Sequence, residues 1–309
     1  MNSEPLFGLF GNPLHDLVDV PPGAVQFSPV VPGARALEDL EQGTLAGLVM
    51  SAPPGTLERR YTLAAGLRAL RAGGSLTALA PKTKGGNRLA KELEAFGCEV
   101  EAWSARHHRF CRTRRPAVWD AEAENSIAQA LRDGAPRFLP DVNLWSQPGV
   151  FSWDRIDQGS ALLLRILPAL SGRGADLGCG LGVLARKVLE APLVTALELI
   201  DIDRRAITAA KQNVTDGRAV FHWADIRKLA DMRDLDFVVM NPPFHDGGLE
   251  DRALGEAFVR QAQRMLRPGG VAWLVANLHL PYETILAAAY SKVDLRAEEQ
   301  GYKVYEATK

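Results

Sequence analysis

A buried strand that two prolines cut short is the feature that most constrains this chain. Leu235–Met240 is an apolar run, and Asn241, Pro242, Pro243 and Phe244 follow it directly. Because neither proline can donate a ladder hydrogen bond, the strand must end there. Asn241 is thereby held in a stiff turn, with hydrogen-bond acceptors beside a flat aromatic face. Such an array suits a planar group that bears an NH2, although a plain loop can also carry this pattern.

The composition predicts a soluble globular protein of about two domains. The chain has 309 residues, 47% of them hydrophobic and 24% charged, with a net charge of −1. No apolar run approaches the ~20 residues of a membrane span, and Met1–Pro5 lacks the features of a signal peptide. The scattered Cys98, Cys111 and Cys179 fit neither a disulfide framework nor a zinc site, and the histidines show no metal-ligand spacing. We expect a cytoplasmic protein, monomeric and without a metal.

The segment 174–185 has the pattern of a strand, a glycine loop and a helix. The loop residues assigned to a cofactor site are Gly178, Cys179, Gly180 and Gly182. Alternate glycines let the main chain turn tightly and approach a ligand, and the helix predicted at about 181–190 directs its N-terminus there. NAD enzymes carry a similar loop, so the loop alone is weak. Asp176, just before it, would repel a pyrophosphate but suits a cationic amino-acid group, as in S-adenosylmethionine (SAM).

A second predicted strand, Val194–Asp203, ends in acidic residues. Asp201 follows the glycine loop at about the spacing at which a carboxylate meets ribose hydroxyls in nucleotide-binding folds. Asp203 is its nearest competitor, but it can also serve only as the cap of a helix over Arg204–Asn213. Ile202, between the two acids, is assigned to the same cofactor site.

A third predicted strand, Ala219–Trp223, leads to Asp225 and Ile226. An acid there can accept a hydrogen bond from an adenine amino group while the isoleucine covers the ring; taken singly, Asp225 is an ordinary cap. Together with the strand that ends at Asn241, these segments give four strand ends at the carboxyl edge of one sheet. Open α/β folds bind ligands at that edge.

The arrangement resembles the class I SAM-dependent methyltransferases, and more closely the RsmC-type rRNA guanine-N2 methyltransferases. The segments that carry the resemblance are Pro148–Ser152, Asp157–Leu164, Asn241–Gly247, Leu266–Gly270 and Gly301–Tyr305. It covers residues 145–309 well and the first half loosely. It implies a Rossmann-like fold with a seven-stranded, mostly parallel sheet, SAM as cofactor, and a guanine of ribosomal RNA in the small subunit as substrate. It also places Asp157 and Gly159 in the cofactor site.

The same resemblance assigns catalysis to the strand end at Asn241. We expect the Asn241 side-chain oxygen and the Pro242 carbonyl to accept the two N–H groups of the target amine, with Pro243 stiffening the loop. Phe244 would stack on the base. His245 would contact the base or a phosphate, or only stabilise the turn.

The first half carries a weak repeat of the second. Residues 67–80 parallel 263–276, and each stretch follows a strand that ends in prolines. Ala52 and Gly55 take the expected positions of Asn241 and Phe244, so this copy would have lost its chemistry. We therefore predict a degenerate methyltransferase-like domain over 1–117, a linker over 118–140 and a catalytic domain over 141–309.

Basic residues concentrate late in the first half. Positions 82–115 hold nine Lys and Arg against four acids, and Arg112, Arg114 and Arg115 are the predicted substrate contacts. Such a cluster can bind an RNA backbone, or it can be a solvated face. The alternative functions are guanine-N2 methylation of large-subunit rRNA, methylation of a protein glutamine amide, amino methylation of DNA, and a SAM- or RNA-binding module without activity.

Overall fold

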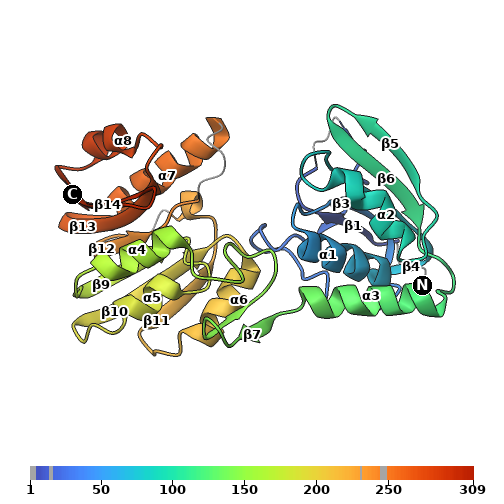
Figure 1. Cartoon of the computed structure of the whole chain (residues 1–309), viewed down its shortest axis with the longest axis horizontal. Coiled ribbons are helices and arrows are strands. Elements are labelled where there is room, and N and C mark those ends of the chain that lie inside the picture. The colour runs from blue at the N-terminus through green and yellow to red at the C-terminus, as the bar shows by residue number, and fades with distance from the viewer. Residues whose placement is uncertain (1–4, 14–16, 230–231, 244–248) are drawn as a thin grey trace. The chain divides into compact units, whose positions relative to one another are not determined.

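The computed structural model describes residues 5–13, 17–229, 232–243 and 249–309, and of residues 249–252 it describes the backbone alone. The chain forms two compact units (Figure 1). The first consists of Met1–Pro136 with Gln147–Gly149, and the second of Arg137–Ser146 with Val150–Lys309. Across the described residues, none of the helices has the length and apolarity that a membrane crossing needs.

The second unit is built on a seven-stranded sheet. Its strands are β9 (Gly172–Leu177), β10 (Val194–Asp201), β11 (Ala219–Trp223), β12 (Leu235–Met240), β13 (Leu266–Asn277), β14 (Lys292–Glu299) and β15 (Tyr302–Thr308). They lie in the order β11-β10-β9-β12-β13-β15-β14, and only β15 runs antiparallel to its neighbours. The predicted Rossmann-like, mostly parallel fold of this half is therefore confirmed.

Helices cover both faces of this sheet (Figure 1). They are α4 (Gln158–Ile166), α5 (Val183–Val188), α6 (Arg204–Asn213), α7 (Leu249–Met265) and α8 (Tyr282–Ala289). Successive side chains of β12 point to opposite faces: Phe237 and Val239 pack under α4, α5 and α6, whereas Val238 and Met240 pack under α7 and α8. Because both faces are buried, the strand reads as a continuous apolar run from Phe237 to Met240.

The first unit has a smaller sheet of the same kind. Its strands are β1 (Phe7–Phe10), β2 (Val25–Gln26), β3 (Leu45–Ser51), β4 (Leu70–Pro81), β5 (Glu101–Ala105) and β6 (His108–Arg114), and its helices are α1 (Thr56–Ala69), η1 (Gly86–Arg88), α2 (Leu89–Glu94) and α3 (Ala121–Gly134). The strand order is β2-β1-β3-β4-β6-β5, and only β6 is antiparallel to its neighbours. The α-helices cover one face of the sheet. On the other face, Val49, Leu79 and Phe110 pack with Leu17 and Val18 from an irregular segment.

The two sheets share one register at their centres. Paired residues before and after a register shift are Leu45–Leu70 and Gly47–Ser75 in the first unit, and Leu235–Leu266 and Phe237–Val271 in the second. Within each shift a glycine turns with positive φ, 73° at Gly73 and 75° at Gly269. The Gly73 N–H donates to the carbonyl of Arg115 at 2.9 Å, and the Gly269 N–H to that of Lys309 at 3.0 Å. The first unit thus repeats the strand arrangement of the second without a counterpart of β11 among the described residues.

The same register corrects one expected correspondence. When β3 and β4 are superposed on β12 and β13 by their pairings, Ser51 and not Ala52 is the equivalent of Asn241. Aligning Pro53 and Pro54 with Pro242 and Pro243 shifts the comparison by one residue, because the first unit has one more residue before its prolines. Through β1 and β9, the register also places Gly11, with φ 78°, at the position of Gly178, with φ 70°.

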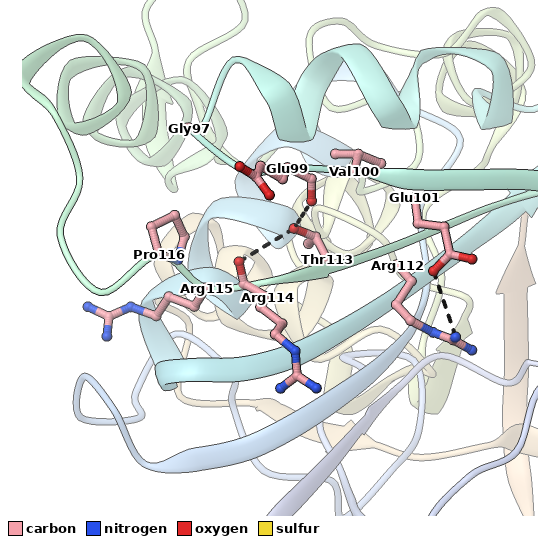
Figure 2. Close-up of a pocket in the computed structure, with 9 residues that line it drawn as sticks. All are labelled: Gly97, Glu99, Val100, Glu101, Arg112, Thr113, Arg114, Arg115 and Pro116. Atoms are coloured by element: carbon pink, nitrogen blue, oxygen red, sulfur yellow. Dashed lines mark hydrogen bonds and ion pairs between the residues drawn. The ribbon is translucent and has the colours of Figure 1, made fainter.

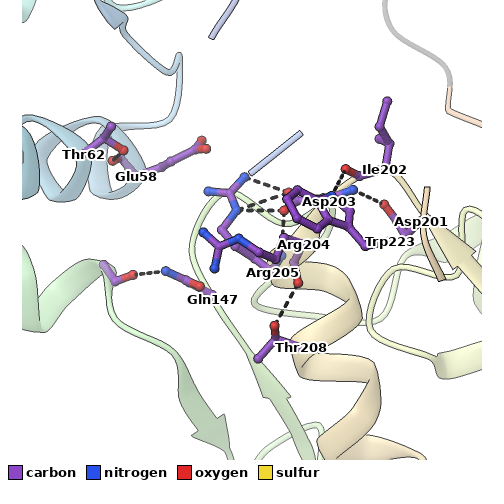
Figure 3. Close-up of polar contacts among 11 residues, drawn as sticks. Glu58, Thr62, Gln147, Asp201, Ile202, Asp203, Arg204, Arg205, Thr208 and Trp223 are labelled. Carbon is purple, nitrogen blue, oxygen red and sulfur yellow. Dashed lines mark hydrogen bonds and ion pairs between the residues drawn. The ribbon is translucent and has the colours of Figure 1, made fainter. Parts of the chain in front are cut away.

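Most of the segment predicted as a linker belongs to the first unit. The segment 118–140 was expected to join two domains, but α3 lies within the first unit, where Ile127 is part of the same core as α1. Residues 147–149 return to that unit, and Gln147 Nε2 donates to the Gly134 carbonyl at 3.0 Å (Figure 3). Helix packing sets this boundary, and composition does not reveal it.

Candidate active site

The predicted strand ends meet at one edge of the second sheet. Because β9, β10 and β12 are parallel neighbours, their carboxyl ends lie side by side around a cavity of about 390 Å³, which is within the usual range for small-molecule sites. Ten of the predicted residues line it: Asp157, Gly178, Gly180, Asp201, Ile202, Asp225, Ile226, Asn241, Pro242 and Pro243. Gly159, Asp176, Cys179 and Gly182 do not line it, and Phe244 and His245 lie outside the described residues.

The Asn241 amide is held from behind by α4. Its Nδ2 donates to Asp157 Oδ2 and to Ser160 Oγ, both at 2.9 Å. A carboxylate can only accept hydrogen bonds, so the amide nitrogen must face Asp157. Both N–H groups are used in this way, and the planar amide turns its carbonyl oxygen, Oδ1, in the opposite direction. Asn241 therefore offers an acceptor.

Backbone donors hold Asp201 at the end of β10. Its Oδ2 accepts from the Gly180 N–H and its Oδ1 from the Asp203 N–H, both at 2.8 Å. Burial raises the pKa of Asp201 to about 6, although these N–H groups oppose the shift. A carboxylate that is fixed in this way and lines the cavity can accept hydrogen bonds from vicinal hydroxyls.

Asp176 is fully buried beneath the glycine loop. Neither carboxylate oxygen has a hydrogen-bond partner of normal geometry among the described residues. Burial, together with the charge of Asp201, raises the pKa of Asp176 to about 8, and the Ala185 N–H offsets only part of this shift. A buried acid without a partner is costly when ionised, so this pair of acids favours a cationic ligand above it.

The glycine loop needs its glycines for conformation. Gly178, Gly180 and Gly182 have φ of 70°, 51° and 79°, values that other residues adopt only at a cost. Gly182 caps α5, which is shorter than the helix predicted at 181–190, because the left-handed turn extends into that range. Cys179 is buried, and burial raises the pKa of its thiol. It packs in the core beneath the loop, as a small residue does.

The competing acid, Asp203, has a structural role. It caps α6 by accepting from the Arg205 N–H at 2.9 Å, and it pairs with the Arg205 guanidinium at 2.7 Å (Figure 3). Both side chains are nearly buried. Beside them, Trp223 Nε1 donates to the Ile202 carbonyl at 2.8 Å, which fixes the backbone of a residue that lines the cavity. Asp201 is therefore the ligand-facing acid of this strand end.

Asp225 both lines the cavity and caps a 3-10 helix, η2 (Ile226–Lys228). Its oxygens accept from the Arg227 backbone and guanidinium at 2.7 to 3.1 Å, and these bonds lower the pKa of Asp225. Ile226 is buried against Ala224 and its neighbours in the core. The acid is thus held ionised, with much of its accepting capacity already used.

Seven residues of the wall were not predicted as site residues: Phe151, Ala224, Arg227, Leu254, Phe258, Asn277 and Tyr302. Phe151 is 61% exposed, although it is aromatic. Burial and the nearby carboxylate of Asp157 raise the pKa of Tyr302. Phe151 and Tyr302 belong to segments that carry the family resemblance, which is the signal that could have found them. Phe258 lies on α7, where its spacing reads as ordinary core.

Gly159 acts through packing. A Cβ at this position would stand 2.8 Å from the Tyr302 ring and 3.1 Å from Asp157 Oδ2. Side chains therefore close around the first turn of α4 and leave no space for a larger residue. Gly159 keeps Tyr302 and Asp157 in place at the wall of the cavity.

The three predicted substrate arginines line a different cavity, of about 630 Å³, in the first unit. Arg112 pairs loosely with Glu101 at 3.9 Å, and Arg114 Nη1 donates to the Gly73 carbonyl at 3.0 Å. Arg115 is nearly buried, with its guanidinium 4.4 Å from the centre of the Trp119 ring. Figure 2 shows the three guanidinium groups spread along β6, pointing in different directions. They form a basic strip and do not converge on one anion.

No group of three or more metal-ligating side chains occurs within the described ranges.

Comparisons with known proteins agree on one kind of protein. The family model described as "Methyltransferase small domain" matches residues 141–306. A "Ribosomal RNA small subunit methyltransferase C" from Pseudomonas entomophila is 34% identical over 79% of this chain and 73% of its own length. Its namesake from Shewanella loihica is 30% identical over 85% of this chain and 77% of its own length.

Among solved structures, a T. thermophilus 16S rRNA N2 G1207 methyltransferase (RsmC), in complex with AdoMet and guanosine, is similar over 100% of this chain and 89% of its own. The TM-score is 0.78 and the sequence identity 23%. At this identity the likeness shows a shared fold, and it extends over both units.

Proposed function

The chain belongs to the ribosomal RNA small subunit methyltransferase C family, and from this membership and the site we propose that it transfers a methyl group from SAM to the exocyclic N2 amine of a guanine in 16S rRNA. The observation that carries the proposal is the oriented amide of Asn241, whose N–H groups are tied to Asp157 and Ser160. A planar amine needs hydrogen-bond acceptors in fixed positions, and a strand end stiffened by prolines holds the Asn241 oxygen in this way.

The residues present fit SAM. The buried Asp176 and the backbone-held Asp201 supply negative charge where a cationic amino acid and a ribose can bind. Ile202 and Ile226 present apolar side chains to the same cavity, which suits the faces of an adenine. When bound, SAM supplies an electrophilic methyl group on a sulfonium.

The chain's own part in the reaction is to hold the amine. An exocyclic guanine amine is a weak nucleophile because its lone pair is delocalised into the ring. Asn241 Oδ1 and the Pro242 carbonyl accept its two N–H groups, which raises electron density on the nitrogen and directs its lone pair. Such catalysis consists of positioning and electrostatic stabilisation. In the transfer, the amine nitrogen would form its new bond to the methyl carbon as the carbon–sulfur bond breaks, and the sulfur would leave with the bonding electrons as a neutral thioether. The methylated nitrogen would then lose its extra proton to water, so no strong base is needed.

The first unit is proposed to hold RNA. Arg112 and Arg114 are exposed on β6, and Arg112 lies 5.2 Å over the ring of Trp103, which itself stacks on Phe110 at 5.2 Å. Exposed guanidinium groups bind phosphates, and the contact with the Trp103 ring holds the Arg112 guanidinium in place. A target base must be unstacked to reach Asn241, so a second holding site is useful.

We also propose that the first unit is a duplicate without catalytic function. At the end of β3, Arg59 Nη1 donates to the carbonyls of Pro53 and Pro54, at 3.3 and 2.7 Å. Its other nitrogens bind Glu92 at 2.7 Å. The acceptors at this strand end are thus used internally. We further propose that the protein acts in the cytoplasm, as a monomer without a metal ion.

The test is transfer of labelled methyl from SAM to three unmodified substrates: small subunits with 16S rRNA, 23S rRNA, and release factors. Label in 16S rRNA supports the proposal. Label in 23S rRNA or on a protein glutamine instead would keep the site but refute the substrate. Binding of SAM without transfer to any of the three would refute the activity on these substrates.

A further inference from the structure

The clamp on Asn241 has parts that the proposed reaction does not itself explain. Asp157 and Ser160 occupy both N–H groups of the amide, although neither residue lies next to Asn241 in sequence. Because the amide is planar, two fixed N–H bonds also fix Oδ1. A free asparagine, by contrast, would rotate about its side-chain bonds and could present either its NH2 or its oxygen.

Helix α4 makes this clamp rigid. The Asp157 oxygen that accepts from Asn241 also accepts from the Ser160 N–H at 2.9 Å, as the N-cap of α4. The Ala161 N–H donates to the Asp157 carbonyl at 2.8 Å. Leu162 and Leu163 are buried in the core that this helix shares with the sheet. The first turn therefore cannot shift without losing the cap and the packing.

We infer that Asp157 and Ser160 are positioning residues, which set the Asn241 amide with Oδ1 toward the target amine. This inference deepens the proposed function and rests on it. It differs from the sequence-based assignment of Asp157 to the cofactor site, under which its negative charge would serve the cationic cofactor.

Substitutions at Asp157 separate these two roles. Asp157→Asn keeps an acceptor oxygen, through its own Oδ1, but removes the charge; Asp157→Ala removes both. If Asp157 positions Asn241, the Asn variant keeps the methylation rate within about 5-fold, whereas the Ala variant loses about 10- to 100-fold with little change in the Kd for SAM. A rise of 10-fold or more in the Kd for SAM in both variants, with an unchanged rate at saturation, would overturn the inference.

A double-mutant cycle tests whether Asp157 acts through Asn241. In an Asn241→Ala background the clamp has nothing to orient, so Asp157→Ala is expected to cost less than about 3-fold. Additive losses in the double variant would contradict the inference. Ser160→Ala is expected to give a smaller loss than Asp157→Ala, and Ser160→Thr, which keeps the hydroxyl, to restore the rate.

Asp157→Ala also removes the N-cap of α4, so a control variant that loses a helix cap elsewhere is needed. Asp120 caps α3 by accepting from the Ala123 N–H at 2.8 Å and has no contact with the site. Asp120→Ala should lower the Tm, as Asp157→Ala does, but leave the methylation rate unchanged. A similar loss of rate in both variants would mean that the Asp157 effect is only one of stability.

The clamp can also be observed without a substrate. In ¹⁵N-labelled protein, the side-chain NH2 signals that disappear in Asn241→Asp belong to Asn241. They should exchange slowly with water in the wild type and in Asp157→Asn, and fast in Asp157→Ala. Fast exchange in the wild type would refute the clamp. A slowly exchanging amide in a protein that fails to methylate 16S rRNA would refute the proposed function and leave the clamp standing.

Discussion

At the scale of single residues, two buried acids and one oriented amide account for the site. Burial raises the pKa of Asp176 to about 8, with a further contribution from the charge of Asp201, and burial raises the pKa of Asp201 to about 6. Asn241 is oriented by two hydrogen bonds at 2.9 Å. Under the proposed function the acids serve binding and the amide serves the reaction, so their effects should separate experimentally.

The raised pKa values predict a dependence of stability on pH. An acid whose folded pKa lies above its unfolded value of about 3.8 binds more protons when folded. Its contribution to the free energy of unfolding is therefore greatest at low pH and declines as pH rises from about 4 to about 8. SAM, as a cation, favours the ionised acids. We expect the rise in Tm caused by SAM to be larger at pH 7.5 than at pH 5.5.

Thermal unfolding at the two pH values, with and without SAM, measures this effect. Asp176→Asn is the control, because it removes the group with the larger shift and should flatten the dependence. A SAM-induced rise in Tm that is the same at both pH values would show that these acids do not meet the cationic part of the cofactor.

Asn241→Ala is expected to abolish most turnover while leaving SAM affinity nearly intact. Loss of one preorganised acceptor costs about 10²–10³ in rate, by analogy with the loss of an oxyanion-hole donor. Single-turnover methylation measures the rate, and calorimetry measures the Kd for SAM. A large loss of SAM binding would contradict this division of roles.

At the scale of elements, parallel strands explain why so much of the site could be predicted. Their carboxyl ends must lie at one edge, so Asp201, Asp225 and Asn241 could be expected close together from the strand ends, and all three line the same cavity. Their roles there stay predictions. The contact between Ser160 and Asn241 could not be predicted, because it depends on where α4 packs. Phe258 could not be predicted for a similar reason. Its spacing on α7 is that of a core residue, and only the packing of α7 brings it to the cavity.

One buried ion pair between elements of the first unit should be costly to break. Arg59 and Glu92 are nearly fully buried and bond at 2.7 Å. Glu92→Ala would leave a buried guanidinium without its counter-charge, which costs about 3–5 kcal/mol. Denaturant unfolding, followed by a probe in the first unit, measures this loss.

The exposed pair Arg112 and Glu101 is the control in the same unit, with side chains 58% and 70% exposed. Glu101→Ala should change the free energy of unfolding by no more than about 0.5 kcal/mol. Equal effects of the two substitutions would mean that the Arg59–Glu92 pair is not buried in solution.

At the scale of the whole molecule, the two units share one strand arrangement but differ in the residues at equivalent positions. The first has Leu9 where the register places Asp176 in the second, and Ser51 where it places Asn241. The boundary between them escaped prediction, because α3 joins the first unit through packing on its core. The proposed loss of chemistry in the first unit and the basic strip along its β6 fit a division in which one unit holds RNA and the other carries out the reaction.

Salt dependence tests this division. Reversing Arg112 and Arg114 to Glu should weaken RNA binding, and the slope of log K against log salt should fall by about 1.4, because each lost phosphate contact on a single strand removes about 0.7. Arg115 is nearly buried, and it is left unchanged so that a loss of RNA binding does not come from a loss of folding. Reversal of two exposed lysines of the second unit, Lys211 and Lys292, is the control for net charge. An unchanged slope in the arginine variant would leave the strip without a role in RNA binding.

The most direct test of the central claim is mass spectrometry of nucleosides from 16S rRNA, after small subunits that lack the modification react with the protein and SAM that carries a deuterated methyl group. We expect N2-methylguanosine with the deuterated methyl, formed by the wild type and nearly absent with Asn241→Ala. Deuterated methyl on another nucleoside, or equal N2-methylguanosine from both proteins, would contradict it.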